Sequence, residues 1–169
     1  MKKILVLLIT VVGFAAGIYT VRSAIDKHYK FTQPIDFSHY VHNTKYKIPC
    51  MACHQRVLFD ARAGIPNVDV CSACHFSLVK KMPKEEQVFK YVKSHKQIPW
   101  LSIYYVPDFV YFSHRRHVGI GKLDCKLCHG DMGSLTSPPT TQFLHIRMQN
   151  CINCHEQRHV STDCGQCHR

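Results

Sequence analysis

The sequence predicts a mostly irregular domain with short α-helices behind one N-terminal transmembrane helix. Three observations predict it. The 169 residues include ten Cys and thirteen His. Residues 4–21 carry no charge, whereas the whole chain has a formal charge of +11. Without the cysteines and the apolar run, the remainder is too lean to bury enough surface by itself. We therefore expect something other than side chains to fill the interior.

All ten cysteines belong to five C-x-x-C-H motifs. The cysteines of these motifs are Cys50/Cys53, Cys71/Cys74, Cys125/Cys128, Cys151/Cys154 and Cys164/Cys167, and the histidines are His54, His75, His129, His155 and His168. Two thiols at this spacing add to the two vinyl groups of one haem, and the adjacent His reaches the iron. A zinc ribbon leaves five histidines at the same offset unexplained, and a disulfide framework needs none. The motifs predict five covalently bound c-type haems, with these histidines as proximal ligands.

The apolar run lies between Lys3 and Arg22. Eighteen helical residues span about 27 Å, slightly less than a hydrocarbon core. A cleaved signal peptide is the alternative, because residues 15–17 (Ala-Ala-Gly) resemble a cleavage site. The run continues to Val21, which favours an uncleaved anchor over residues 1–24 and a haem domain over residues 25–169.

A sequence repeat precedes the motifs. Seven residues separate the unit at residues 37–42 (F-S-H-Y-V-H) from Cys50. Seven residues likewise separate the unit at residues 112–117 (F-S-H-R-R-H) from Cys125. The offset of 75 residues indicates a duplicated module with two motifs in each copy, over about residues 31–80 and 106–169, and the fifth motif closes the chain. A weaker third copy, residues 143–148, has Met148 in place of the second His.

An iron that passes electrons without binding small molecules needs a second axial ligand. Five histidines outside the motifs match five irons: His39, His42, His114, His117 and His145. The alternates are Met148, His159 and His95. A methionine in place of a histidine raises the potential of its haem.

Two segments complete the predicted elements. Residues 83–96 begin with Pro83 and place two glutamates in the first turn, which predicts a helix with His95 on its inward face. Residues 98–112 contain Pro99 and Pro107, which block a helix, and are expected to run extended. We expect this aromatic segment to pack against haem edges inside the domain; contact with a quinone or partner is the alternative.

The basic charge does not indicate a nucleic-acid partner. Each haem carries two negatively charged propionates and a positively charged iron, so five haems add a net charge of about −5 to −10. The net charge of the haem-loaded protein is therefore much smaller than the formal +11 of the chain. Lysines and arginines that hold propionates or meet an acidic membrane partner fit this balance better.

The F-S-H-x-x-H units resemble those of small multihaem cytochromes of the c3 and c7 kind (class III). This resemblance implies that the first His of each unit serves the haem just downstream. His39 then ligates the haem at Cys50/Cys53, and His114 the haem at Cys125/Cys128. It also implies that the second His serves a different haem and ties the modules together.

Residues 107–117, 33–39 and 64–66 resemble the membrane-anchored pentahaem subunit of alternative complex III. The resemblance implies electron conduction within a quinol-oxidising respiratory or photosynthetic complex toward a periplasmic carrier or oxidase. It implies no catalysis by the chain itself. The implied partners are iron–sulfur and quinol-oxidising subunits, a monohaem cytochrome c and a soluble electron carrier. The implied location is the bacterial inner membrane, crossed once, with the haem domain on the periplasmic side.

Three alternatives compete with this reading. A menaquinone reductase contains a similar haem subunit, but with six haems, and five motifs favour alternative complex III. A free-standing quinol dehydrogenase feeding another partner is the second alternative. The third is a multihaem enzyme of the nitrite-reductase type with one open iron, which is disfavoured because candidate ligands suffice for every iron.

Overall fold

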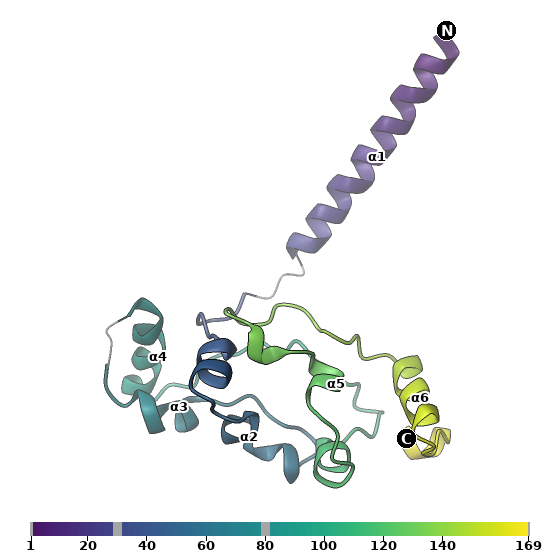
Figure 1. Cartoon of the computed structure of the whole chain (residues 1–169). Coiled ribbons are helices and arrows are strands. Elements are labelled where there is room, and N and C mark those ends of the chain that lie inside the picture. The colour runs from purple at the N-terminus through teal and green to yellow at the C-terminus, as the bar shows by residue number, and fades with distance from the viewer. Residues whose placement is uncertain (1, 29–31, 79–81, 169) are drawn as a thin grey trace. The chain divides into compact units, whose positions relative to one another are not determined.

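The computed structural model describes residues 2–28, 32–78 and 82–168. The chain divides into two compact units, Met1–Thr32 and Gln33–Arg169. We describe each unit separately (Figure 1). The first contains the helix α1 (Lys2–His28), and the second contains all five C-x-x-C-H motifs.

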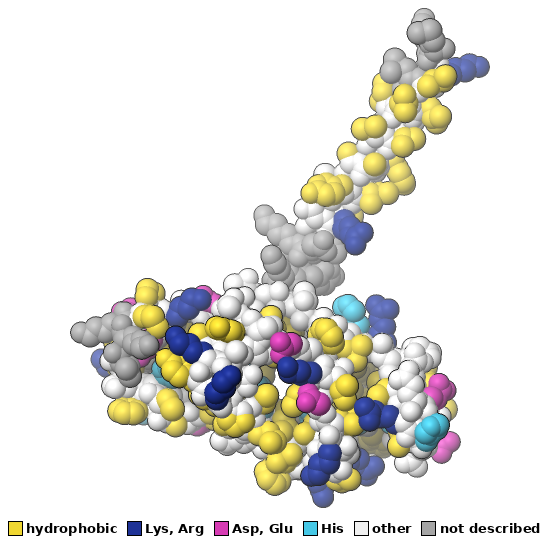
Figure 2. Space-filling model, in the orientation of Figure 1, with side chains coloured by type: hydrophobic (Ala, Val, Ile, Leu, Met, Phe, Trp, Pro, Cys, Tyr) yellow, Lys and Arg dark blue, Asp and Glu magenta, His cyan; other side chains and the backbone are white. Residues whose placement is uncertain are grey.

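Helix α1 exposes apolar side chains between residues 7 and 21, as Figure 2 shows. Phe14 and Tyr19 are each 74% exposed, and Ile9 is 63% exposed. The predicted N-terminal helix is therefore present as a helix. Within residues 2–28, 32–78 and 82–168, however, we find no helix whose length and apolarity together suffice to cross a membrane.

The second unit consists of short helices joined by irregular segments. In chain order they are the π-helical turn η1 (Tyr40–Lys45), α2 (Cys50–Cys53), the 3-10 turn η2 (Gln55–Leu58), α3 (Val68–His75), α4 (Pro83–Ser94), the π-helical turn η3 (Arg115–Ile120), α5 (Lys126–His129), the 3-10 turn η4 (Met132–Ser134), α6 (Met148–Gln157) and α7 (Cys164–Cys167). The described residues form no strand beyond an isolated antiparallel bridge between Val110 and His168. The prediction of a mostly irregular domain with short helices is confirmed.

Side chains supply only a small core. Ile35, Val68, Val88 and Ile98 form one buried cluster, against which Trp100 packs. This cluster joins α3 and α4 to the segment that follows α4. Val68 and Cys71 connect this cluster to α3, and Val57 is the one further buried apolar side chain among the described residues. This agrees with the expectation that the interior is filled by something other than side chains.

Helix α4 confirms the predicted helix but corrects the placement of His95. Val88 is buried, and Tyr91 and Val92 pack against the core, as the periodicity predicts. His95 instead ends the helix with a φ of 54° and an exposed side chain. Its backbone N–H donates to the carbonyls of Tyr91 and Val92. The left-handed backbone at this cap turns the side chain away from the face that helical periodicity gives it.

The aromatic segment after α4 forms no helix, as the prolines predict, but it is not extended throughout, because the Val110 N–H donates to the Pro107 carbonyl at 2.9 Å in a turn. The Tyr104 hydroxyl donates to the Cys128 carbonyl at 3.2 Å and accepts from the Phe143 backbone N–H at 3.0 Å. Trp100 and Tyr104 are therefore packed inside the domain, and their contact with haem edges stays a prediction. Tyr105 and Tyr111 are exposed, at 68% and 57%, so the packing does not extend to the whole segment.

The two copies of the repeat pack on each other reciprocally. The backbone N–H of Tyr40 donates to the Leu135 carbonyl at 2.8 Å, and that of Arg115 donates to the Asp60 carbonyl at 3.1 Å. Tyr40 and Arg115 are equivalent positions in the repeat, as are Asp60 and Leu135, because each pair differs by 75 residues. The first copy therefore contacts the second as the second contacts the first.

A second pair of contacts follows the same symmetry. The Thr44 hydroxyl donates to the Gly133 carbonyl at 2.6 Å. At the equivalent place, a Cβ on Gly119 would lie 3.0 Å from the Leu58 carbonyl oxygen, so the backbones approach closely. Contacts exchanged in this way are those of an approximate twofold axis, the arrangement that an isologous dimer has between two chains. The duplication thus folds as an internal pseudo-dimer.

Asn67 is the polar residue that links α3 to the segment after α4. Its side-chain oxygen accepts from the Val68 N–H at 2.9 Å and from the Ile98 N–H at 2.7 Å. Its amide group donates to the Ile98 carbonyl at 3.0 Å. The side chain therefore caps α3 and bonds both backbone groups of Ile98, as a neighbouring strand would.

We predict that Asn67→Ala lowers the free energy of unfolding of the haem-loaded protein by about 2 kcal/mol, because partly buried backbone groups lose their partners. Denaturant unfolding followed by circular dichroism measures the change. Gln33→Ala is the matched control, since Gln33 makes the same paired bonds to Leu101 at an exposed position. An Asn67→Ala loss no larger than that of Gln33→Ala would contradict the assigned role.

Candidate haem-binding sites

Each C-x-x-C-H motif folds as one helical turn. The backbone N–H of His54 donates to the Cys50 carbonyl at 2.9 Å, and that of His168 donates to the Cys164 carbonyl at 2.8 Å. Side chains three and four positions apart on a helical turn share a face, so both thiols and the imidazole are presented together. We number the sites in chain order. Site 1 is Cys50, Cys53 and His54; site 2 is Cys71, Cys74 and His75; site 3 is Cys125, Cys128 and His129; site 4 is Cys151, Cys154 and His155; site 5 is Cys164, Cys167 and His168.

The ten thiols are unpaired in the structure. Burial is the main cause that raises the pKa of the thiols of Cys53, Cys71, Cys125, Cys128 and Cys151. In the described parts of the chain, we also find no group of three or more His, Cys, Asp or Glu side chains arranged to hold a metal ion directly. The disulfide and zinc-ribbon alternatives therefore find no support in the geometry.

The F-S-H-x-x-H units fold into two equivalent three-ring clusters. In the first, Phe37 meets His39 edge-on with ring centres 4.8 Å apart and stacks on His42 at 4.6 Å. In the second, Phe112 meets His114 edge-on at 4.9 Å and stacks on His117 at 4.8 Å. One phenylalanine thus orients two imidazoles in each copy, which gives the phenylalanine of the motif a structural reason.

Three histidines of these clusters face a motif histidine at nearly the same separation. The ring centres of His42 and His75 are 6.1 Å apart, those of His114 and His129 are 6.3 Å apart, and those of His117 and His155 are 6.2 Å apart. Metal–imidazole bonds are about 2 Å long, so two rings bound to opposite sides of one metal have centres roughly 6 Å apart. The residues present therefore fit an iron with two histidine ligands.

His39 interacts electrostatically with His54, the remaining motif histidine of the first module. Burial first, and then the charges of His54 and His42, lower the pKa of His39 to about 4. Burial also lowers the pKa of His54, His75 and His129. These imidazoles are consequently neutral at pH 7, and only a neutral imidazole has a ring nitrogen lone pair for a metal.

Backbone carbonyls fix the tautomer of four histidines. The Nδ1 atoms of His42 and His117 lie 2.8 Å from the carbonyl oxygens of Ser38 and Ser113, four residues earlier. A carbonyl oxygen only accepts, so Nδ1 carries the proton and Nε2 keeps its lone pair. The same contact joins His114 to Ala61 at 3.1 Å and His155 to Ser161 at 2.8 Å. Metal-ligating histidines commonly donate their other N–H in this way.

Two buried polar atoms near the first cluster have no hydrogen-bond partner among the described residues. They are Nδ1 of His39 and Nε1 of Trp100. Both rings contact Phe37, with the Trp100 ring centre 6.4 Å from that of Phe37. A buried indole N–H without an acceptor is costly. A haem propionate supplies acceptor oxygens, so this orphaned donor fits the presence of a haem.

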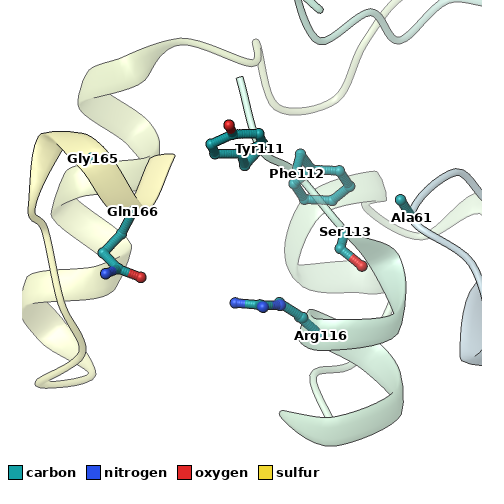
Figure 3. Close-up of a pocket in the computed structure, with 7 residues that line it drawn as sticks. All are labelled: Ala61, Tyr111, Phe112, Ser113, Arg116, Gly165 and Gln166. Carbon is teal, nitrogen blue, oxygen red and sulfur yellow. The ribbon is translucent and has the colours of Figure 1, made fainter. Parts of the chain in front are cut away.

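Site 5 differs from the other four. The ring of Phe109 is nearly parallel to that of His168, with centres 5.9 Å apart. The Tyr111 N–H donates to the Cys167 carbonyl at 2.8 Å. A cavity of about 480 Å³ lies between α7 and η3 (Figure 3). It is lined by Ala61, Tyr111, Phe112, Ser113, Arg116, Gly165 and Gln166. Its volume is in the range of cofactor pockets, and the Arg116 side chain supplies a cation for an anionic group there.

The structure brings four of the five predicted distal histidines beside a motif histidine. The fifth, His145, is exposed, and so are the alternates Met148, His159 and His95. In the described part of the chain, the ring that stacks on His168 is that of Phe109. The structure therefore does not indicate which side chain completes site 5.

Two features differ from the expectations or were missed. The pairs His42–His75 and His117–His155 each lie within one module, so they do not tie the modules together. The reciprocal backbone contacts of the pseudo-dimer do so instead. The sequence also did not predict the contact between the His114 ring and the Ala61 carbonyl, because every residue type carries a backbone carbonyl.

Comparison with known proteins identifies the family of the chain. Residues 110–169 match the family described as cytochrome c7 and related cytochrome c. The chain is also 33% identical, over 161 residues, to the multiheme cytochrome c subunit of menaquinone reductase from Nitratidesulfovibrio vulgaris; the match covers 81% of this chain and 77% of the relative. The chain therefore belongs to the multihaem c-type cytochromes, the family that includes cytochrome c7 and this menaquinone reductase subunit.

Proposed function

We propose that the chain binds five c-type haems and conducts electrons as one subunit of a quinone-linked membrane complex. The observation that carries the proposal is the set of three histidine pairs with ring centres 6.1, 6.2 and 6.3 Å apart, each containing one C-x-x-C-H histidine. The chain by itself is an electron-transfer subunit and not an enzyme. The haems, when bound, supply reversible one-electron chemistry at each site.

The residues of the chain divide this work. The ten motif cysteines form thioether bonds, and the five motif histidines are the proximal ligands. His39, His42, His114 and His117 are the distal ligands of sites 1, 2, 3 and 4. Carbonyl contacts hold His42, His114 and His117 in the tautomer that leaves Nε2 free. A histidine on each side of the iron keeps small molecules from binding it, which suits electron transfer and not substrate chemistry.

For site 5 we propose His145 as the distal ligand, because residues 143–148 are the weaker third copy of the ligand-bearing unit. Met148, His159 and His95 are the alternates. Ligation by Met148 would make site 5 the haem of highest potential and the exit of the electron path.

The relative from Nitratidesulfovibrio vulgaris is a menaquinone reductase subunit. This supports quinone-linked electron transfer and the presence of other subunits. Our finer proposal is a complex of the alternative complex III type, in which iron–sulfur and quinol-oxidising subunits deliver electrons and a monohaem cytochrome c and a soluble carrier or oxidase receive them. Five motifs in the sequence support this type. A menaquinone reductase type is the second candidate, supported by the 33% identity.

We further propose that α1 attaches the protein to the bacterial inner membrane with the haem-binding unit on the periplasmic side. The exposed apolar side chains between Lys3 and Arg22 support attachment to a lipid or protein surface. The periplasmic side follows from the covalent haems, since the c-type cytochromes are assembled outside the cytoplasm.

The haem count is tested by intact mass and by pyridine haemochrome absorbance. We predict five haems for the native chain and four for the double variant Cys164→Ala with Cys167→Ala, because one pair of thioether bonds is lost. Gln166→Ala, between the same two cysteines, is the control and retains five haems. A native chain with fewer than five haems, or an unchanged count in the double variant, would contradict the assignment of site 5.

The distal ligands are tested by the spin state of the oxidised protein. We predict that His117→Ala converts one of the five haems from low spin to high spin, because one axial ligand is lost. Electron paramagnetic resonance measures the converted fraction. The neighbouring exposed Arg115→Ala is the control and leaves the spectrum unchanged. If His117→Ala left every haem low spin, the pairing of His117 with His155 would be wrong.

The complex is tested by mild detergent extraction of native membranes, followed by sizing and identification of the co-eluting subunits. We predict a multi-subunit complex that reacts with a soluble menaquinone analogue. Oxidation of the quinol form with reduction of a c-type cytochrome would support the alternative complex III type, whereas reduction of the quinone by a reduced cytochrome would support the menaquinone reductase type. A haem protein that elutes alone would contradict both.

A further inference from the structure

Within each module, one ring cluster joins two sites. Phe37 contacts both His39, the proposed distal ligand of site 1, and His42, which faces the histidine of site 2. In the second module, Phe112 contacts His114 and His117 in the same way, and these face the histidines of sites 3 and 4. Sites 1 and 2 are therefore neighbours, as are sites 3 and 4.

The pseudo-twofold axis decides which sites meet between the modules. His114, which faces site 3, is bonded through both its backbone N–H (2.9 Å) and its Nδ1 (3.1 Å) to the carbonyl of Ala61. Ala61 lies shortly after the site-1 motif in the sequence and next to Asp60, the acceptor for Arg115. The ligand-bearing cluster of the second module thus rests on the loop that follows site 1.

Sites 1 and 3 lie on the two sides of the contact between the modules. The loop after site 1 accepts hydrogen bonds from the second module through Asp60 and Ala61, and the loop after site 3 accepts one from the first module through Leu135. The first cysteines of the two sites, Cys50 and Cys125, are 75 residues apart and occupy the same position in the two copies of the repeat. The reciprocal contacts therefore place the loops after sites 1 and 3 at the axis of the pseudo-dimer.

Site 5 lies beyond site 4. The Nδ1 atom of His155 bonds the Ser161 carbonyl at 2.8 Å, which folds the chain after α6 back toward α7. The antiparallel bridge from Val110 to His168 then fixes α7 beside the segment that leads into Phe112. The fifth motif is thus attached to the second module on the side of site 4.

We infer that electrons travel in the order site 2, site 1, site 3, site 4 and site 5, and that they cross between the two modules at the pair of sites 1 and 3. The order differs from that of the motifs in the sequence. It rests on the proposed function, since it needs haems at these sites. Each step between neighbours moves one electron, so one iron is oxidised as the next is reduced, and no bond forms or breaks.

Two consequences follow for the complex. Sites 2 and 5 are the ends of the path, so the subunits that deliver and receive electrons approach these two sites. Sites 1 and 3 are internal and are passed by every electron that travels between the modules. The duplication explains this order. The two copies meet through their first sites, 1 and 3, and the second site of each copy, 2 or 4, therefore lies farther from the axis.

The first test is the position of the five irons in the haem-loaded protein, measured by electron cryo-microscopy of the detergent-extracted complex. We expect the shortest iron–iron separations to link sites 2 and 1, 1 and 3, 3 and 4, and 4 and 5. A site 2 that lies between sites 1 and 3 would overturn the inference. Intact mass of the same sample tests the proposed function separately, because the haem count does not depend on the order of the sites.

The second test uses redox coupling in solution and compares His39→Met with His42→Met. Each variant raises the potential of its own site. An early-reduced site has lost one positive charge, so it lowers the potential of a close neighbour more than that of a distant one. We expect His39→Met to lower the potential of site 3 roughly twofold more than His42→Met does, given the distance dependence of charge interaction.

The potentials of the individual sites are followed by nuclear magnetic resonance of the haem methyl groups during a redox titration. Both variants must retain five haems by mass. A larger shift of site 3 in His42→Met than in His39→Met would overturn the inferred order, because site 2 would then be the neighbour of site 3.

Discussion

The facing of two imidazoles across a separation of 6.1 to 6.3 Å is the constraint on which the haem-binding unit depends. Every other feature of the unit serves it. A helical turn presents each motif histidine with its two thiols, a phenylalanine orients two distal rings in each cluster, and backbone carbonyls set the tautomer. Burial, followed by the charges of His54 and His42, lowers the pKa of His39 to about 4, so its ring is neutral at pH 7.

This arrangement also explains why a chain with so small an apolar core folds into a defined unit. The buried cluster of Ile35, Val68, Val88 and Ile98 stabilises only the region of α3 and α4. Elsewhere the backbone is held by reciprocal contacts between the two repeats and by the motif turns. Covalent haems attached at these turns add apolar surface that the side chains lack, so folding and cofactor attachment are coupled as they are in metal-stabilised small domains.

Much of the site was predictable from the sequence, and the reasons are physical. The C-x-x-C-H spacing is local chemistry, and the two F-S-H-x-x-H units fold alike because their sequences repeat. The helix over residues 83–94 followed from its proline, its glutamates and its apolar period. The exposed His95 did not, because a left-handed cap breaks the period at its last residue. The twofold contact of the modules depends on backbone groups such as those of Asp60 and Leu135, which carry no sequence signature.

Near-infrared magnetic circular dichroism of the oxidised, haem-loaded protein tests the central claim most directly, because the energy of its charge-transfer band reports the pair of axial ligands on each low-spin iron. The geometry of the four clustered histidines predicts that at least four haems show the band of two histidine ligands. A spectrum in which fewer than four haems carry two histidines would contradict the account.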